Sequence, residues 1–463
     1  MRNITSYTLT RYQQLLLHLV IGVVVSVFSV FTQLYLAVIV VYFIYKIVYN
    51  QNKTLYALGA AAYIASAEVF LRMTGAMPFW EMGKYLVIFF MLLGMLYEGF
   101  KLKAWPVLIF LGLLLPGVVI TYLNFDYFEE SFRKTILFNL SGPLSLFVTA
   151  LFCYHRQIKF KTLLKVVDMM ILPIISMVVY IILYAPSYEQ VVFTTESNQV
   201  MSGGYSGNQV STILGLGMFL TYVRFLIPYR NSVLNIINIA LLGLFTYRGL
   251  LTFSRGGFIT AIVMMAVFTV LFINWAPLVK KAQATMKLVG LGVGGLLIWG
   301  VVMLVTGGLI FNRYTGKNAK GIQQDITTGR GDIISEELSA FLEDPFLGIG
   351  VGMGKFFRYE LDGEIAASHN EVARMIAEHG LFGILALAIL LLIPLGFLLS
   401  KNRNLLMLPF VAFWFLTINH SAMRVALPGF MYGLALLNVT YASKKTKKSK
   451  IKTAPVPRQQ AVA

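Results

Sequence analysis

The sequence predicts an all-α polytopic integral membrane protein, and two observations lead to this fold class. The 463 residues are 58% hydrophobic and only 13% charged, with a mean hydropathy of +0.75, which is too apolar for a soluble globular protein. Continuous apolar runs of about 17 to 25 residues, long enough to cross a hydrocarbon core ~30 Å thick, recur from Tyr12 to near Tyr441. Continuous runs predict helices rather than barrel strands. We expect roughly fourteen of them.

Basic residues gather in alternate loops, and this pattern predicts how the chain is oriented. Clusters within residues 101–103, 156–165, 224–230 and 280–287, and in the tail 443–463, should be cytoplasmic by the positive-inside rule. Both termini would then be cytoplasmic and the number of helices even. Insertion topology also explains the formal net charge of +18, so we expect no nucleic-acid partner.

The remaining loops should face the periplasm or the cell exterior, and they hold the unusual polar residues. The expected organisation is residues 1–311 as transmembrane helices with short loops, 312–370 as a long periplasmic loop with a catalytic cap, 371–442 as C-terminal transmembrane helices, and 443–463 as a basic cytoplasmic tail. We find no internal repeat and no separable soluble domain.

The long loop should contain an amphipathic helix over residues 329–345. Pro345 should stop this helix, and residues 348–356, GIGVGMGKF, predict a flexible run. The expected apolar face is formed by Ile333, Ile334, Leu338, Phe341 and Leu342. The loop is basic and suited to attract anions, with Arg313, Lys317, Lys320, Arg330, Lys355 and Arg358. Taken alone, Arg330 is an ordinary solvated arginine.

The stretch SHNEVARMIAEHGLFG, residues 368–383, predicts a helix start that carries a histidine. Ser368 and Glu371 fit a capping box, so the helix should begin near His369, with Asn370 in its first turn. A helix start attracts phosphate and disfavours imidazolium, which would leave the histidine neutral and able to accept a proton. A histidine hydrogen-bonded at the membrane rim explains the stretch equally well.

Two arginines lie near the external end of one apolar run. Arg248 and Arg255 are seven residues apart, about two helical turns, so both could share one face if the helix persists to Arg255. Arginine in the membrane usually faces a cavity or an anion, whereas snorkelling to headgroups is an alternative that fits Arg255 better. Gly256 and Gly257 would allow a bulky group to approach closely.

Further polar residues lie at external turns. His420 and Arg424 line the same cavity or simply end a helix. Glu68 lies within an apolar span, where an ion pair with Arg72, four residues later, is the simplest explanation.

The sequence predicts neither a metal nor a cofactor. Cys153 is the single cysteine, and no cluster of cysteine and histidine has metal-site spacing. Asp126, Glu129 and Glu130 lack the close pairing expected of a carboxylate metal site.

Several motifs together resemble a known family. His369, Asn370, Gly380 and Gly383 fit the pattern His-Asn, nine residues, Gly, two residues, Gly, which resembles the signature of the bacterial O-antigen ligases. Residues 329–356 are similar to the segment before this signature in the broader O-antigen ligase and polymerase superfamily. FSRGG, which contains Arg255, resembles the family's arginine-bearing turn, and GYSGNQVSTILGLG, which contains Asn208, resembles its asparagine-containing helix start. These motifs cover mainly residues 204–383.

The resemblance implies a GT-C-like fold with about 12 to 14 transmembrane helices and a defined reaction. A glycan would pass from undecaprenyl diphosphate to a sugar hydroxyl on the periplasmic face of the bacterial inner membrane, without metal or cofactor. His369 would match the essential histidine, and Arg255 and Arg330 the two essential arginines. The partners would be the lipid-linked glycan, membrane lipids, and an acceptor that is lipid A core or a lipid-linked repeat.

These roles agree with the chemistry of the side chains. The planar fork of arginine suits a diphosphate leaving group, and a neutral histidine suits deprotonation of an alcohol. Other residues expected to bind substrate are Asn208, Arg248, Asn370, Arg374, His420 and Arg424.

Several functions remain open at this stage. A ligase would use lipid A core as acceptor, whereas a polymerase would use a single lipid-linked repeat, and a protein O-oligosaccharyltransferase would use the same site. A lipid-linked-glycan flippase is a different class, which should show repeats and a charged pathway at the bilayer midplane. The polar residues instead gather towards one face, which favours an enzyme.

Overall fold

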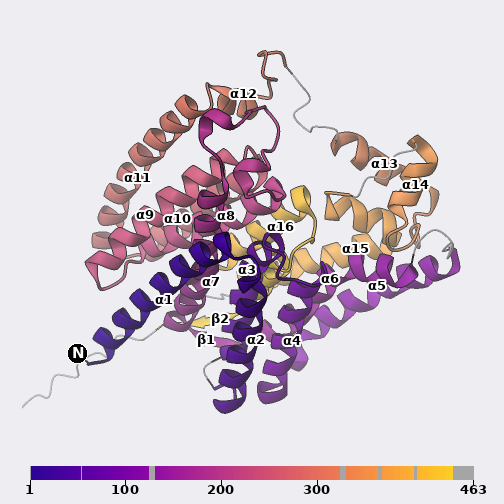
Figure 1. The fold of residues 1–463 in the computed structure, drawn as a ribbon. Helices are drawn as coiled ribbons and strands as arrows, with labels where there is room; N and C mark the ends of the chain where they lie inside the picture. The colour runs from indigo at the N-terminus through magenta and orange to yellow at the C-terminus, as the bar shows by residue number, and fades with distance from the viewer. Residues whose placement is uncertain are drawn as a thin grey trace, which may run out of the picture.

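The computed structural model describes residues 2–53, 55–124, 131–323, 330–362, 368–400 and 404–441. Figure 1 shows a bundle of tilted helices with a helical cap beyond one end, and the all-α polytopic fold class is confirmed. The α-helices are α1 (Arg2–Val27), α2 (Phe31–Tyr49), α3 (Tyr56–Met73), α4 (Met82–Glu98), α5 (Trp105–Asn124), α6 (Phe132–Cys153), α7 (Phe160–Tyr184), α8 (Gly207–Leu226), α9 (Ser232–Leu251), α10 (Arg255–Trp275), α11 (Leu278–Val305), α12 (Leu309–Thr315), α13 (Arg330–Glu343), α14 (Gly354–Asp362), α15 (Glu371–Leu399), α16 (Met407–Ser421) and α17 (Leu427–Ala435). Short 3₁₀ turns lie at Leu102–Ala104, Tyr188–Gln190 and Val200–Ser202, and the strands are β1 (Gln157–Lys159) and β2 (Asn438–Thr440).

Ten of the described helices are long and apolar enough to cross a membrane. Four more apolar helices complete the bundle: α3, which is made less hydropathic by Glu68 and Arg72, and α4, α16 and α17, which have only 17, 15 and 9 residues. Within the part of the chain that the structure describes, these are fourteen apolar helices, α1–α11 and α15–α17. The helix number expected from the apolar runs therefore agrees with the fold.

Small residues bring the central helices together. Helices α3 and α8 are buried along nearly their whole length, and α8 packs between α9 and α10. A Cβ on Gly215 of α8 would lie 2.2 Å from the carbonyl oxygen of Gly257 of α10, so the two backbones touch. Close backbone approach through small residues is the usual basis of helix packing inside a membrane.

Within the part of the chain that the structure describes, one end of the bundle carries basic segments that the sequence placed in the cytoplasm. Arg11 donates to the carbonyl of Asp168 at 2.9 Å, and Arg224 lies 3.2 Å from the carboxylate of Asp168. Strands β1 and β2 pair in parallel, with Gln157 opposite Asn438. The sorting of loops into two ends is thus visible in the fold, while the side of the membrane that each end faces stays a prediction.

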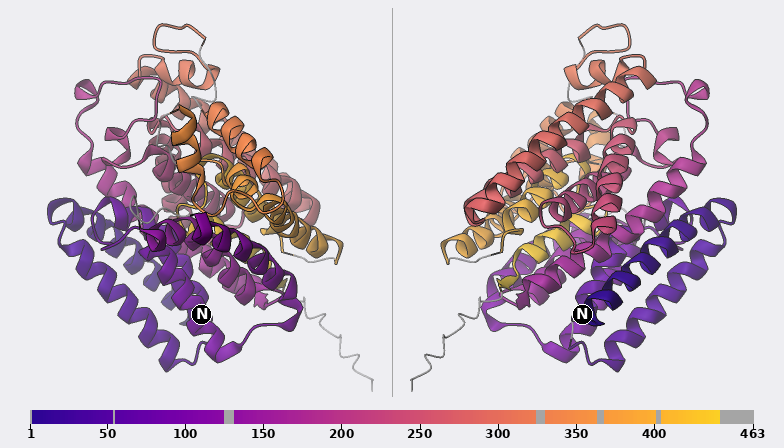
Figure 2. Two further views of the ribbon diagram at one scale, coloured as in Figure 1. Left: turned by 90° about the vertical axis from the view of Figure 1, so that its right-hand side faces the viewer. Right: turned by 90° about the vertical axis from the view of Figure 1, so that its left-hand side faces the viewer.

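The opposite end carries the cap, formed by α12, α13 and α14 (Figure 2). The expected amphipathic helix is present as α13, and much of its predicted apolar face does not pack against the protein. Ile334, Leu338 and Leu342 are exposed, whereas Glu337 and Ala340 are buried. The ion pair of Glu337 with Arg358 of α14, at 3.4 Å, explains which face points inwards.

The glycine run after α13, residues 348–356, begins with backbone hydrogen bonds to α15. The prediction that this run is flexible is therefore wrong. Ile349 and Gly350 donate their backbone N–H groups to the carbonyls of Ala377 and Glu378 at 3.0 and 3.1 Å. A Cβ on Gly348, whose φ is +75°, would lie 2.5 Å from the backbone of α15. Glycine is needed here because only a residue without a Cβ allows the two backbones to pair.

Helix α15 is interrupted at Gly380, where φ is 57° and ψ is −136°. The interruption frees the carbonyls of Ala377 and Glu378 for the glycine run. Three residues later, a Cβ on Gly383 would lie 2.0 Å from the carbonyl oxygen of Met375. The two glycines of the resemblance motif therefore have a structural role, which is to form and pack this break.

Candidate functional site

The turn that carries the candidate base consists of residues 368–370, and we call it the His369 turn. Asn370 caps α15, because its side-chain oxygen accepts from the backbone N–H groups of Val372 and Ala373 at 2.9 and 3.1 Å. Ser368 Oγ instead accepts from the backbone N–H of Asn370 at 3.1 Å. The expected capping box is therefore wrong: the helix begins at Glu371, and the residue with the extended backbone, Asn370, takes the capping position.

His369 consequently precedes the helix instead of lying in its first turn. The half-buried His369 accepts a hydrogen bond at its backbone carbonyl from the N–H of Ala422 at 3.1 Å, which fixes its main chain. The side-chain oxygen of Asn370 is occupied by the helix, so Asn370 could offer a substrate only its amide N–H groups.

A turn between α16 and α17, residues 422–426, holds the His369 turn from the other side. Arg424 donates to the carbonyl of Ser368, and the carbonyl of Arg424 accepts from Arg72 at 3.1 Å. Glu68 accepts from the backbone N–H of Ala426 at 2.6 Å. The ion pair of Glu68 with Arg72, predicted from their spacing, is confirmed, and it supports this turn.

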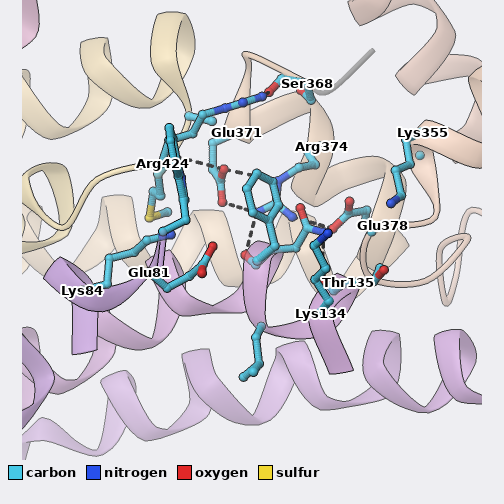
Figure 3. Close-up of a pocket in the computed structure, with 18 of the residues that line it drawn as sticks. Glu81, Lys84, Lys134, Thr135, Lys355, Ser368, Glu371, Arg374, Glu378 and Arg424 are labelled. Atoms are coloured by element: carbon cyan, nitrogen blue, oxygen red, sulfur yellow. Dashed lines mark hydrogen bonds and ion pairs between the residues drawn. The ribbon is translucent and has the colours of Figure 1, made fainter. Parts of the chain in front are cut away.

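A cavity of about 800 Å³ borders the His369 turn through Ser368. It lies between α4, α6, α13, α14, the start of α15 and the α16–α17 turn, as Figure 3 shows in part. Its charged lining residues are Glu81, Lys84, Arg133, Lys134, Glu337, Lys355, Arg358, Glu371, Arg374, Glu378 and Arg424. The cations outnumber the carboxylates among them, so the cavity suits an anion.

Arg374 organises the carboxylates of the cavity. It forms ion pairs with Glu371 and with Glu378, the latter at 2.6 Å, and it donates to the carbonyl of Asn139 at 3.2 Å. These bonds use most of the N–H donors of the guanidinium group. Arg374 therefore fixes the side chains that line the cavity and has few donors left to bind an anion. The spacing of Arg374 from the two glutamates, at i−3 and i+4, was visible in the sequence.

Glu337 brings the cap to the same cavity. Its carboxylate lies 3.4 Å from the guanidinium of Arg358, and its side chain is 2% exposed. Burial raises the pKa of Glu337 above its usual range, while hydrogen bonding and Arg358 act against this shift. The sequence did not single out Glu337, because its partner Arg358 lies in another helix, 21 residues further along the chain.

Asn208, Arg255 and His420, three other predicted residues, lie where α8 and α10 begin and α16 ends. Asn208 accepts from Ser254 Oγ at 2.8 Å, and His420 Nε2 lies 3.3 Å from Thr212 Oγ1. A Cβ on Gly256 would lie 2.4 Å from Cδ2 of His420, so the bulky group that approaches this glycine is the His420 ring. This second cluster thus contains Asn208, His420 and the turn that leads into Arg255.

Arg248 and Arg255 do not share a helical face, contrary to our expectation. Helix α9 ends at Leu251 and α10 begins at Arg255, and Phe253 between them has a φ of 55°. The break reverses the chain and separates the two side chains.

The two arginines also have different partners. Arg248 donates to the carbonyls of Ile181 and Met201 at 3.2 and 3.3 Å, which fastens the loop between α7 and α8. Arg255 donates to the carbonyl of Arg313 in α12 at 3.3 Å. Arg255 therefore lies beside the cap, whereas Arg248 is engaged in holding the loop.

The end of α16 connects the two groups of residues. His420 packs on Gly256, next to Arg255, and Ala422 donates to His369. One short segment, residues 420–422, therefore contacts both His369 and the residue after Arg255. Arg330 begins α13, but its side chain lies outside the described residues.

A metal site does not emerge from the residues with described positions: no group of three or more His, Cys, Asp or Glu side chains among them could hold a metal ion. Asp126, Glu129 and Glu130 lie outside this part of the chain. The expected independence of metal stays a prediction.

The fold and the charged cavity at one end of the bundle define a multi-pass membrane protein with a polar site near one surface. Residues 239–388 match the family model described as O-Antigen ligase, so this part of the chain is similar to the O-antigen ligase superfamily. The match supports the predicted resemblance and, with it, a function of the membrane O-antigen ligase and polymerase type, a glycosyltransferase-like enzyme class. A comparison with curated proteins found no match. The matched residues include Arg248, Arg255, Arg330, His369, Asn370 and Arg374, whereas Asn208, His420 and Arg424 lie outside them.

Proposed function

We propose that this protein transfers a glycan from undecaprenyl diphosphate to a sugar hydroxyl of lipid A core. The reaction would take place on the periplasmic face of the bacterial inner membrane, with both termini in the cytoplasm. The observation that supports the proposal most directly is the His369 turn, which borders a cationic cavity and is fastened by Ala422 and Arg424. The family match supports the same class of reaction.

His369 acts as the general base in this proposal. The acceptor hydroxyl oxygen attacks the anomeric carbon of the donor sugar, the bond from that carbon to the diphosphate oxygen breaks, and the hydroxyl proton passes to the imidazole. Lipid diphosphate leaves with the bonding electron pair. A positioned base of this kind contributes about 10²- to 10⁴-fold to the rate.

Arg255 and Arg330 hold the diphosphate as its negative charge grows. Arginine does so through charge-assisted, bidentate bonds, and stabilising the leaving group in a partly dry site is the larger part of catalysis. Arg255 begins α10, whose free backbone N–H groups favour an anion at the same place. Asn208 and His420 border this position and hold the donor glycan. No metal is needed, because guanidinium groups supply the positive charge.

Transfer can be tested in vesicles that contain the full-length protein, lipid-linked glycan donor and lipid A core acceptor. We expect polysaccharide attached to lipid A core, and loss of this product on His369→Ala substitution while the protein still inserts and folds. A product lengthened on undecaprenyl diphosphate would assign the polymerase reaction instead. Retained transfer by the substituted protein would eliminate the proposed base.

A further inference from the structure

Lys84, near the start of α4, has a buried ammonium group that faces the cavity. The residue is 1% exposed and belongs to the cavity lining. Its Nζ donates to Ser141 Oγ at 2.7 Å, and no carboxylate of the described residues lies within 4.0 Å of it. An ammonium group has three donors, so a single neutral hydroxyl leaves both its charge and most of its donors uncompensated.

Burying a charge without a counter-charge is unfavourable, and buried charges are normally paired. The carboxylates of the cavity are already engaged elsewhere: Glu371 and Glu378 pair with Arg374, and Glu337 pairs with Arg358. Glu68, Glu81 and Glu371 lie near enough to act on Lys84 electrostatically, but among the described residues none of them forms an ion pair with its ammonium group.

Other cations lie around the same space. Figure 3 shows Lys84 from α4, Lys134 from α6 and Arg424 from the α16–α17 turn around the cavity. Arg424 donates to the carbonyl of Ser368, a neutral acceptor, and Lys134 is exposed at the rim. Glu81 is a carboxylate on this side of the cavity, but Lys84, Arg133, Lys134 and Arg424 outnumber it, so this side stays positive.

We infer that this side of the cavity is a binding site for an anionic group, a carboxylate or a phosphate, on the acceptor glycan. The assignment to the acceptor rests on the proposed function, which places the donor diphosphate beside Arg255 on the other side of the His369 turn. An acceptor held by Lys84 and Arg424 enters from the α4 and α6 side and presents its hydroxyl near His369. The cavity volume of about 800 Å³ is in the range of ligand sites.

A buried ammonium group selects against neutral sugars. A ligand without an anion would leave Lys84 uncompensated in a cavity from which it had removed water, so binding of a neutral sugar is weak. The acceptor is therefore an acidic or phosphorylated sugar.

Direct binding tests this site without transfer activity. The full-length protein in nanodiscs of zwitterionic lipid is titrated with glucose 6-phosphate, glucuronate and glucose, and binding is measured by calorimetry or ligand-observed NMR. We expect both anionic sugars to bind at least about 10-fold more tightly than glucose, as charge-assisted hydrogen bonds imply. Lys84→Met should remove most of this preference.

Two variants serve as controls. Lys101→Met makes the same substitution at an exposed lysine beyond the other end of α4 and should leave binding unchanged. Ser141→Ala removes the protein partner of Lys84 but keeps its charge, so binding should be retained or strengthened. Size-exclusion profiles and thermal unfolding show that each variant is folded.

Three results would overturn the inference: equal binding of glucose and glucose 6-phosphate, full binding by Lys84→Met, or loss of binding by Ser141→Ala in a folded protein. Nanodiscs that contain phosphatidylglycerol distinguish a glycan anion from a lipid headgroup. Displacement of the sugar phosphate by this lipid, dependent on Lys84, would assign the site to lipid instead. If the protein transfers glycan but binds neutral and anionic sugars equally, the inference fails and the proposed function stands. If it binds anionic sugars selectively but transfers no glycan, only the proposed function fails.

Discussion

The backbone N–H of Ala422 donates to the carbonyl of His369 at 3.1 Å, which joins the α16–α17 turn to the start of α15. Two residues before Ala422, the ring of His420 packs on Gly256 at the start of α10. Three segments that are well separated in sequence therefore meet around one histidine. In the proposed function, the donor binds beside Arg255 and the acceptor binds in the cationic cavity, and this segment contacts both regions.

Substitution of His369 should affect chemistry and leave the fold intact. We expect His369→Ala to lower the transfer rate by about 10²- to 10⁴-fold, since a general base is lost. The unfolding temperature should change little, because the hydrogen bond that holds this residue comes from its main chain. Vesicle transfer assays and thermal unfolding of the purified protein measure the two effects. Equal losses of activity and stability would indicate a structural histidine.

Arg255→Lys should show whether the geometry of the guanidinium is needed. Lysine keeps the charge but cannot form the bidentate bonds that a diphosphate accepts, so we expect transfer to fall by about 10- to 100-fold. Arg248→Lys is the matched control: it should lower stability more than the transfer rate, because Arg248 holds the carbonyls of Ile181 and Met201. Equal effects of both substitutions on transfer would argue against separate roles.

Gly380→Ala should disrupt the break in α15. The residue has a φ of +57°, and a Cβ there would lie 2.7 Å from the backbone nitrogen of Gly348, so we expect a loss of at least about 1–2 kcal/mol in the free energy of unfolding. Gly396→Ala, in the same helix, meets no atom within 4 Å and should be neutral or stabilising by about 0.4–1 kcal/mol. Thermal or chemical unfolding compares the two variants. Equal stability would contradict the role we assign to the break.

The sequence predicted the features that depend on local pattern. The apolar runs, the loop sorting, the helix at α13 and the ion pair of Glu68 with Arg72 each follow from spacing within one segment. The predictions were wrong where two neighbouring residues could each form the same local structure. Ser368 and Asn370 are both good caps, and only the tight turn between them decides that Asn370 caps the helix.

The parts of the site that were missed depend on contacts between distant segments. Lys84 lies 57 positions from Ser141, its hydrogen-bond partner, and no spacing rule connects them. Glu337 was not among the predicted site residues, because the pairing of α13 with α14 through Arg358 cannot be read from the periodicity of α13 alone. Tertiary contacts of this kind decide which polar residues face a cavity.

Chelation of divalent metal should leave transfer unchanged. The proposed mechanism uses guanidinium groups for charge stabilisation and imidazole for proton transfer, so no step requires a metal ion. Vesicles treated with EDTA, compared with vesicles supplied with excess magnesium, give the measurement. A rate that falls on chelation and recovers on addition of one particular metal would contradict the metal-independent mechanism.

Glu337 should make the stability of the cap depend on pH. Burial raises its pKa above the unfolded value, so its contribution to stability is fully present below the unfolded pKa and is lost as the pH rises through the folded pKa. Glu337→Gln keeps the shape without a charge, and stability of this variant should vary less across that pH range. Its amide can still accept from Arg358, which retains the contact between α13 and α14.

Hydrogen exchange of α13 and α14, measured in both proteins at several pH values, tests this effect at the cap itself. We expect protection in the wild-type protein to decrease as the pH rises above the usual range of a glutamate, and protection in Glu337→Gln to stay nearly constant. Glu343→Gln, near the exposed end of α13, is the matched control and should keep the wild-type pH dependence. If the wild-type protein and Glu337→Gln respond alike, the buried carboxylate does not control docking of the cap.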